Sequence, residues 1–489
     1  MYPNNVDRVP PTNLNWCEYN QKNKPQGNAV ATEVMLSFSS GIILATILFT
    51  GDLKRDEWVE NHSNTFILMS AVSFFAGAII GAVIASYLVK IAPKKKIKHV
   101  PIVAFYLTGI LLASLPDNAS IIMVARILSG IGYGFIQLTF IVHCSEVSVN
   151  RLRGMFLNTF NLCLGAGMIV GSAFMMTNQT NTGLAHYRCF GIFMIVYTCL
   201  AHIFLFCFNI ESPVLLLQNG DVVTATQNMM KLRNESMETW DIRNDISEFK
   251  AMLVEDSQCD KQIWTNGNSR PLLILICTKV LLVLSFNYPL NMLRINTVDG
   301  FFKLADFSMA GMFLLSLRLI IACFTLFTVD RFGRRFHLLY GGVSAGAIAI
   351  LFSVFLFLFG VNEGTLITPT IFCFLFETLP VFMYGVSDTL SGEAFPIVKK
   401  PQSIAFLIVI ENIVQAILLV STYHLLFDVR ATNLGDFYAV PLVLGLALLL
   451  VTYVCFKYVP ETTKLSIRET KNLFRGSPQT TIAGIWYSA

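Results

Sequence analysis

The sequence predicts an all-α membrane protein with twelve transmembrane helices. Its 489 residues are 54% hydrophobic and only 13% charged, whereas a soluble domain carries about 25% charged residues. The mean hydropathy is +0.60, and the apolar residues gather in long runs, each near the roughly 20 residues that a membrane-spanning helix needs. This composition excludes a disordered chain, a small disulfide scaffold and almost any water-soluble enzyme.

Twelve apolar runs follow one another along the chain in two groups of six. The expected spans are 33–50, 65–89, 100–115, 119–142, 154–176, 187–208, 271–292, 308–329, 337–360, 368–390, 403–426 and 437–457. The expected organisation is a tail (1–32), a six-helix half (33–208), a linker (209–270), a second six-helix half (271–458) and a tail (459–489). The two halves are expected to be related by pseudo-symmetry.

The charges between the spans predict the orientation. Five lysines lie within 90–98 after the second span, and further bases follow the fourth, eighth and tenth spans. The alternate loops contain few bases. Lys and Arg gather on the cytoplasmic side of membrane proteins. Both termini are therefore expected in the cytoplasm, and the plasma membrane is the expected location.

Four N-x-S/T sequons provide a second view of the same topology. The predicted orientation places Asn61, Asn118 and Asn178 outside and Asn234 inside. Only the loops around Asn61 and Asn178 are long enough for a glycan to clear the bilayer. These two asparagines are the expected glycosylation sites.

The linker contains no sign of a catalytic domain. Ile242, Ile246, Phe249 and Leu253 recur at helical spacing between charged residues, which predicts an amphipathic helix. No glycine spacing typical of a phosphate-binding loop is present, and no His, Cys and acid pattern has metal-ligand or catalytic-triad spacing. We expect neither an enzyme nor a cofactor or metal. The net charge of +4 is too small to indicate nucleic acid, so the expected partners are the bilayer and a small-molecule substrate.

An internal repeat relates the two halves. Glu146 precedes Arg153 by seven residues after the fourth span, and Glu393 precedes Lys400 by seven after the tenth. Glu211 in ESP and Glu461 in PET follow the sixth and twelfth spans. Two similar motifs at nearly the same offset indicate a duplicated six-helix unit, the plan of many transporters.

These segments resemble the major facilitator superfamily and, within it, the sugar porter family of glucose- and trehalose-type carriers. Residues 126–154 are similar to the family's fourth span and following loop, and DRFGRR at 330–335 is similar to the loop after the eighth. PETTKLS at 460–466 and ESPVLLL at 211–217 resemble two further family motifs. The resemblance implies a twelve-helix carrier that moves sugar by alternating access around a midplane site.

The sequence departs from the family at several positions. The loop after the second span lacks the acid and glycine of the family motif, and Lys400 replaces an arginine. The positions that the family implies for substrate contact contain Asn161, Arg318 and Asp388, and the seventh-span element reads VLS at 283–285. The candidate substrate-binding residues are Asn161, Ser285, Asn287, Arg318, Asp388, Glu411 and Asn412.

The predicted function is transport of a hexose or a disaccharide such as trehalose by facilitated diffusion. Amides suit a sugar, which offers hydroxyls and no charge, and the first-span stretch MLSFSSGIILATILF contains no acid for proton coupling. Arg318 with Lys279 suits an anion instead. Three alternatives remain: a carrier of small organic anions, a proton-coupled symporter and a transport-inactive sensor.

Arg318 lies among apolar residues in the middle of its span, where a charge needs a partner. We expect Glu411 or Asp388 to be that partner, slightly ahead of the substrate itself. At one membrane face, charges at the helix ends are expected to form a cytoplasmic gate of ion pairs between the halves. Its expected members are Glu146, Arg153, Glu211, Asp330, Arg331, Arg334, Arg335, Glu393, Lys400 and Glu461.

Overall fold

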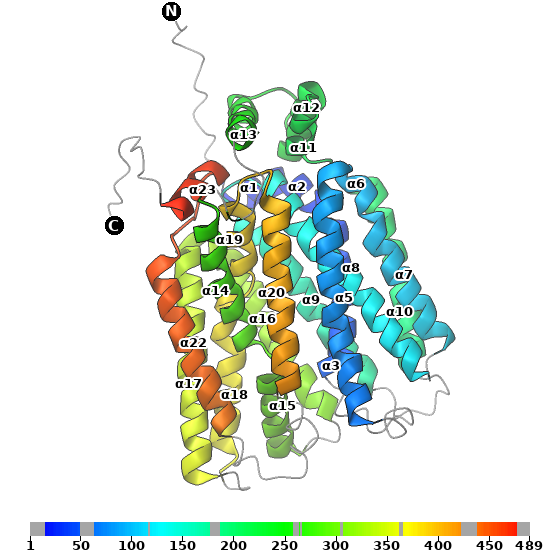
Figure 1. The fold of residues 1–489 in the computed structure, drawn as a ribbon, viewed down its shortest axis with the longest axis vertical. Coiled ribbons are helices and arrows are strands. Elements are labelled where there is room, and N and C mark those ends of the chain that lie inside the picture. Colours follow the sequence, from blue (N-terminus) through cyan, green and yellow to red (C-terminus); the bar gives the residue numbers. More distant parts are fainter. Residues whose placement is uncertain are drawn as a thin grey trace, which may run out of the picture.

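The structure, a computed structural model, describes residues 15–48, 63–115, 118–176, 186–257, 264, 267–303, 307–360, 365–421 and 438–476. Within these residues, twelve helical segments are long and apolar enough to cross a membrane. Figure 1 shows them running alongside one another as a single bundle. The predicted all-α fold with twelve spans is confirmed, and the chain is a multi-pass integral membrane protein.

The first six spans form one half of the bundle. They are α3 (Ala31–Leu48), α5 (Asn64–Ile91), α6 (Lys94–Ile97) with α7 (His99–Ser114), α8 (Ala119–Val147), α9 (Arg153–Met176) and α10 (His186–Phe208). Helix α5 packs along α8, and α3 packs along α9. Glycine permits this close approach, because a Cβ atom on Gly134 would lie 1.9 Å from the Ala78 carbonyl oxygen. Small residues at such contacts are typical of membrane helices.

The second six spans form the other half, and two of them are broken. They are α14 (Ser269–Ser285) with α15 (Tyr288–Phe302), α16 (Phe307–Phe332), α17 (Arg334–Phe359), α18 (Ile367–Thr378) with η3 (Pro380–Met383) and α19 (Val386–Ala394), α20 (Lys400–Ser421) and α22 (Ala439–Tyr458). The seventh span breaks at Phe286, and the Asn287 side chain restarts it by accepting a hydrogen bond from the Leu290 N–H at 3.0 Å. The tenth breaks where Pro380 begins a 3₁₀ turn and Gly385 takes a positive φ of 79°. Irregular backbone within a span is tolerated where protein or a cavity surrounds it.

The two halves meet along two pairs of helices, α5 against α20 and α9 against α16. Helices α15 and α19 of the second half also contact α3 and α8 of the first. The interface between the halves therefore contains both broken spans.

Among the described residues, six helices outside the spans lie at one end of the bundle (Figure 1). They are α1 (Trp16–Lys22), α2 (Lys24–Ala29), α11 (Pro213–Gln218), α12 (Val222–Arg233), α13 (Trp240–Ser257) and α23 (Ile467–Arg475). We name this end the capped face and the other end the opposite face. Helix α13 is the amphipathic helix predicted in the linker, and its Met252 packs with Val214, Ile397 and Ile467.

The sequons are placed only in part. Asn61 and Asn178, the expected glycosylation sites, lie outside the described residues. Asn118 caps α8, since its side chain accepts a hydrogen bond from the Ser120 N–H at 3.0 Å. Asn234 ends α12 in the left-handed conformation.

Candidate functional site

A cavity of about 130 Å³ lies between the two halves. Leu48, the last residue of α3, lines the side of the cavity that lies toward the opposite face. The polar side chains that line it are Tyr133, Asn161, Tyr288, Asn291, Arg318, Tyr384, Glu411, Asn412 and Gln415, and the aromatic ones add Phe74, Phe75 and Phe286. The lining is drawn from both halves.

The predicted substrate-binding residues fall into three groups. Asn161, Arg318, Glu411 and Asn412 line the cavity. Asp388 is not among the lining residues but accepts a hydrogen bond from the Asn161 side chain at 2.9 Å. The remaining two residues lie at the break in the seventh span.

Ser285 and Asn287 are buried and serve the backbone rather than the cavity. The Ser285 hydroxyl donates to the Leu281 carbonyl at 3.0 Å, and the Asn287 amide donates to the Leu284 carbonyl at 2.5 Å. Five other polar lining residues lie outside the predicted set: Tyr133, Tyr288, Asn291, Tyr384 and Gln415. Gln415 follows Glu411 by one helical turn, and this spacing was the available signal.

Lys279 forms a cluster of three charges with the two acids beside the cavity. Its ammonium nitrogen lies 2.6 Å from an Asp388 oxygen and 2.6 Å from a Glu411 oxygen. The first half adds a neutral donor to each acid, Asn161 to Asp388 and Gln137 to Glu411, the latter at 3.2 Å. We name Lys279, Asp388 and Glu411 the lysine cluster.

Arg318 takes part in a separate cluster, and the expectation that it pairs with Glu411 or Asp388 is wrong. Two of its nitrogens contact the two Glu377 oxygens at 2.7 and 3.0 Å. Arg294 lies 2.9 Å from the same carboxylate. We name Arg294, Arg318 and Glu377 the arginine cluster.

Helix packing explains why Arg318 has this partner. Helix α16 packs against α15 and α18, which contain Arg294 and Glu377. Helix α14 packs against α19 and α20, so Lys279 engages the two acids that were expected to meet Arg318. The three bases and three acids of the two clusters sum to zero formal charge.

Ion pairs and helix caps join the halves at the capped face. The Arg153 guanidinium of α9 lies 3.0 Å from a carboxylate oxygen of Glu393 on α19. The other Glu393 oxygen pairs with Arg334, which also contacts Asp330 at 3.2 Å. Asp330 in turn accepts hydrogen bonds from the Gly154 and Met155 N–H groups at 3.2 and 2.8 Å. A carboxylate of the second half therefore caps the positive N-terminal end of a helix in the first half.

A second set of contacts lies on the first-half side of this face. Lys94 pairs with Glu146, which also accepts a hydrogen bond from Ser212. The Lys400 ammonium of α20 donates to the Ser145 hydroxyl of α8 at 3.2 Å. The charged residues of these two sets of contacts form what we name the inter-half network. Its members are Lys94, Glu146, Arg153, Asp330, Arg334, Glu393 and Lys400.

The duplicated acids Glu211 and Glu461 occupy equivalent places. Glu461 accepts hydrogen bonds from the Arg334 and Arg335 N–H groups at 3.1 and 3.0 Å. Glu211 accepts from the Lys94 and Lys95 N–H groups at 3.1 and 3.2 Å. Lys94 and Lys95 therefore occupy, in the first half, the positions that Arg334 and Arg335 occupy in the second. This equivalence holds although the first-half loop lacks the acid and glycine of the family motif.

These contacts of Glu211 and Glu461 stay within one half, as does the hydrogen bond from Arg335 to the Phe456 carbonyl at 2.7 Å. Arg331 is exposed at the end of α16. Six of the ten residues expected to form a gate belong to the inter-half network, and Glu211, Arg335 and Glu461 brace their own half.

Replacing Glu461 with Gln is expected to reduce stability at neutral pH. Burial opposes ionisation of this carboxyl, but hydrogen bonds from Thr463 and from the Arg334 and Arg335 N–H groups outweigh it and lower its pKa. The loss should be about 1 kcal/mol, as for other helix caps. A group with a lowered folded-state pKa stabilises above its unfolded-state pKa and loses that effect as the pH falls through the folded-state value. Thermal unfolding should therefore separate the variant from the native protein at pH 7, and acidification should remove the difference.

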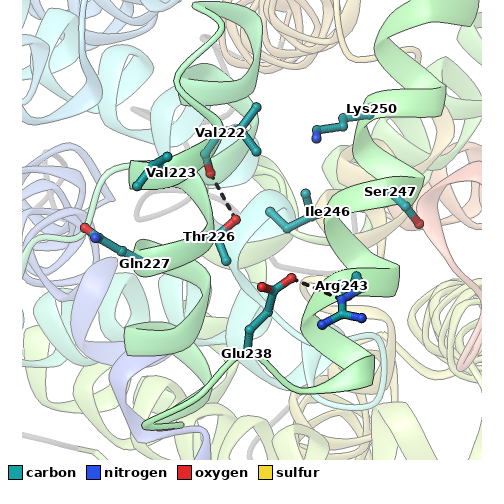
Figure 2. A pocket seen from close by; sticks show the side chains of 9 residues that line it. All are labelled: Val222, Val223, Thr226, Gln227, Glu238, Arg243, Ile246, Ser247 and Lys250. Atoms are coloured by element: carbon teal, nitrogen blue, oxygen red, sulfur yellow. Dashed lines mark hydrogen bonds and ion pairs between the residues drawn. The ribbon is translucent and has the colours of Figure 1, made fainter. Parts of the chain in front are cut away.

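A second hollow lies outside the bundle, between α12 and α13 of the linker (Figure 2). Val222, Val223 and Ile246 form its apolar part. Glu238 and Arg243 form an ion pair of 3.3 Å at its edge. Both helices lie beyond the capped face, so this hollow is separate from the cavity between the halves.

Two six-helix halves around a central cavity, joined by a charged network at one face, define a membrane protein of the major facilitator type. The model of the Sugar (and other) transporter family matches residues 28–474, and the chain belongs to this family. The resemblance found in the sequence motifs is thereby confirmed.

Individual relatives are distant. The chain is 22% identical over 450 residues to the high glucose sensor RGT2 of Saccharomyces cerevisiae. The aligned residues make up 87% of this chain and 57% of that relative. It is 24% identical over 463 residues to the low-affinity glucose transporter HXT4 of the same species, covering 86% and 76%. Sugar transport protein 4 of Arabidopsis thaliana is 23% identical over 306 residues, covering 59% and 56%. The chain thus spans just over half the length of the first and third of these relatives.

Solved structures show the same fold. The proton:xylose symporter XylE bound to 6-bromo-6-deoxy-D-glucose superposes with a TM-score of 0.74 at 17% identity, covering 93% of this chain and all of that one. The inward-open conformation of XylE from E. coli has a TM-score of 0.63 at 16% identity, covering 92% and 98%.

Proposed function

We propose that the protein is a carrier of the sugar porter type that moves a hexose, or a disaccharide such as trehalose, across a membrane. One observation supports this most directly. The cavity lies between the halves, and the charged groups in and beside it are paired within the lysine and arginine clusters. Amides, hydroxyls and aromatic rings remain to face a ligand, and these groups suit a solute with many hydroxyls and no charge. The names of the curated relatives agree with this class of solute.

The proposed mechanism is alternating access. The inter-half network holds the two halves together at the capped face, while the cavity lies toward the opposite face. Separation of Arg153 from Glu393, and of Asp330 from the start of α9, would open the capped face to the cavity. The network is therefore proposed as the gate of this carrier.

The proposed orientation places the capped face and both termini in the cytoplasm, and the proposed location is the plasma membrane. The support is the clustering of lysines and arginines in the short loops of the capped face. In this orientation the closed network corresponds to a carrier that faces outward.

Facilitated diffusion is the proposed mode of transport. Asp388 and Glu411, the two acids of the lysine cluster, are already balanced in part by Lys279. A carrier whose acids have an internal cation does not need a coupling ion for neutralisation.

Uptake by proteoliposomes tests this proposal. Labelled sugars and organic acids are offered with and without a pH gradient. We expect saturable entry of a neutral sugar that stops at equal concentrations and is not driven further by the gradient. Uptake of organic acids alone would contradict the proposal. Ligand-dependent thermal stabilisation without uptake would instead identify a sensor, a function that the name of one relative makes a specific second candidate.

Tyr384→Phe is expected to weaken sugar binding while leaving the fold intact. Tyr384 lines the cavity, and a lost hydrogen bond of about 1 kcal/mol raises KM about fivefold. Tyr453→Phe is the matched control, because Tyr453 is 64% exposed on the surface of the bundle. Initial uptake rates over a range of sugar concentrations measure both variants. Equal KM values for the two would remove Tyr384 from the binding site.

A further inference from the structure

The lysine cluster connects the two halves in the middle of the bundle. Lys279 is 1% exposed, and both of its carboxylate partners lie at 2.6 Å. The neutral donors that complete the two acids, Asn161 and Gln137, belong to the other half of the protein. The cluster is thus a buried ionic site that both halves help to build.

We propose that Lys279 is a tethered counter-cation that fills the place of a coupling ion and so makes the carrier independent of the proton gradient. This inference deepens the proposed function and rests on it. It also predicts what happens when the tether is removed: a proton takes the place of the ammonium, and transport becomes proton-dependent.

The geometry explains why a proton would bind. Asp388 and Glu411 contact the same nitrogen, so their nearer oxygens lie within twice that contact distance of each other. Two carboxylates that share a buried site cannot both remain ionised near neutral pH, and they titrate as a pair. Removing one partner of a buried ion pair leaves an uncompensated charge. Protonation of the pair is the least costly way to restore balance.

Other charged and titratable groups around the cluster do not replace Lys279. Tyr133 of α8 and Tyr384 after η3 line the same cavity as Glu411, but a phenol group carries no charge at ordinary pH. Arg318 of α16 is held by both oxygens of Glu377. Thr278 and Ser387, which contact each other at 3.0 Å beside the cluster, supply hydroxyl groups without charge.

The proton would have a route to the cluster and an effect on transport. Glu411 lines the cavity, and 14% of its side chain is exposed. A proton in the cavity can therefore reach the pair. Because Asn161 and Gln137 donate to these acids from the other half, the charge of the pair influences how firmly the halves hold together at the midplane.

The experiment compares the native protein with Lys279→Met, Lys279→Arg and the double variant Lys279→Met/Asp388→Asn. Lys279→Arg keeps the cation, and the double variant keeps the formal charge of the native cluster. Infrared spectra of each reconstituted protein at pH values from 5 to 8, a range about the neutral point, detect a protonated carboxyl group. Sugar uptake with and without an inward proton gradient is then measured on the same preparations.

We expect a protonated carboxyl in Lys279→Met at neutral pH and none at this site in the other three proteins. Sugar uptake by Lys279→Met should slow by about tenfold as the pH rises by one unit above the titration point, and a proton gradient should accelerate it. If Lys279→Met unfolds at neutral pH, acidification should restore its thermal stability, because the proton then replaces the ammonium.

A folded Lys279→Met protein without a protonated carboxyl at neutral pH would overturn the inference, as would gradient-driven uptake by the native protein. The infrared result does not depend on transport. If no protein takes up sugar but the carboxyl appears as expected, the proposed function fails and the ionic role of Lys279 stands.

Discussion

Glu393→Gln is expected to shift the carrier strongly toward the conformation that is open at the capped face. Glu393 is fully buried and pairs with Arg153 of the other half and Arg334 of its own. Removing one partner of a buried ion pair costs about 3–5 kcal/mol. Of the two ion pairs that Glu393 forms, only the one with Arg153 joins the two halves, so we expect a shift in the equilibrium of at least about tenfold rather than the full cost.

Cysteine labelling measures this shift. A cysteine introduced at Gln415, a half-buried residue that lines the cavity, reports access in a background without other reactive cysteines. An impermeant thiol reagent should label it readily in the native protein and slowly with Glu393→Gln. Glu211→Gln is the matched control, because Glu211 binds the N–H groups of Lys94 and Lys95 within its own half. Similar labelling of both variants would remove the gating role from Glu393.

Glu377→Gln is expected to be the most destabilising of these substitutions. The Glu377 carboxylate is 2% exposed and is contacted by both Arg294 and Arg318. Its neutralisation leaves two buried guanidinium groups that have lost their shared anion. We expect a loss of about 3–5 kcal/mol in the free energy of unfolding.

Thermal unfolding in detergent compares Glu377→Gln with Glu411→Gln. The second variant makes the same chemical change but leaves one ammonium with one carboxylate, Lys279 with Asp388. It should therefore be clearly the more stable of the two. Adding Arg318→Gln to Glu377→Gln should restore part of the loss, since only one unpaired guanidinium then remains. Equal melting temperatures for the two single variants would show that the arginine cluster is not held together by charge.

The number and order of the spans followed from the sequence because hydropathy and length alone decide which segments enter a bilayer. The breaks in the seventh and tenth spans were not predicted. Pro380 and Gly385 are visible in the sequence, but a proline within an apolar run also occurs in continuous kinked helices. Neighbouring helices determine which outcome follows, because they satisfy the backbone groups that the break releases.

The sequence predicted the residues of the site only to the extent that their expected depth in the membrane identifies them. Asn161, Glu411 and Asn412 were expected at the midplane and line the cavity, whereas Ser285 and Asn287, expected there as well, bond to the backbone. Depth follows from distance along the chain. The direction in which a side chain points does not follow from distance along the chain when the span is broken.

The sequence by itself determined the all-α class, the twelve spans, the duplicated acids and the family motifs, since each depends on local composition or spacing. Only the tertiary structure decided the ionic partners. Arg318 meets Glu377 rather than Glu411, and Lys94 takes the place of a second-half arginine despite the lost motif. A charge in a low-dielectric interior pairs with whichever opposite charge packing brings within contact. That choice depends on the rotation and neighbours of each helix, which hydropathy and spacing along one chain do not contain.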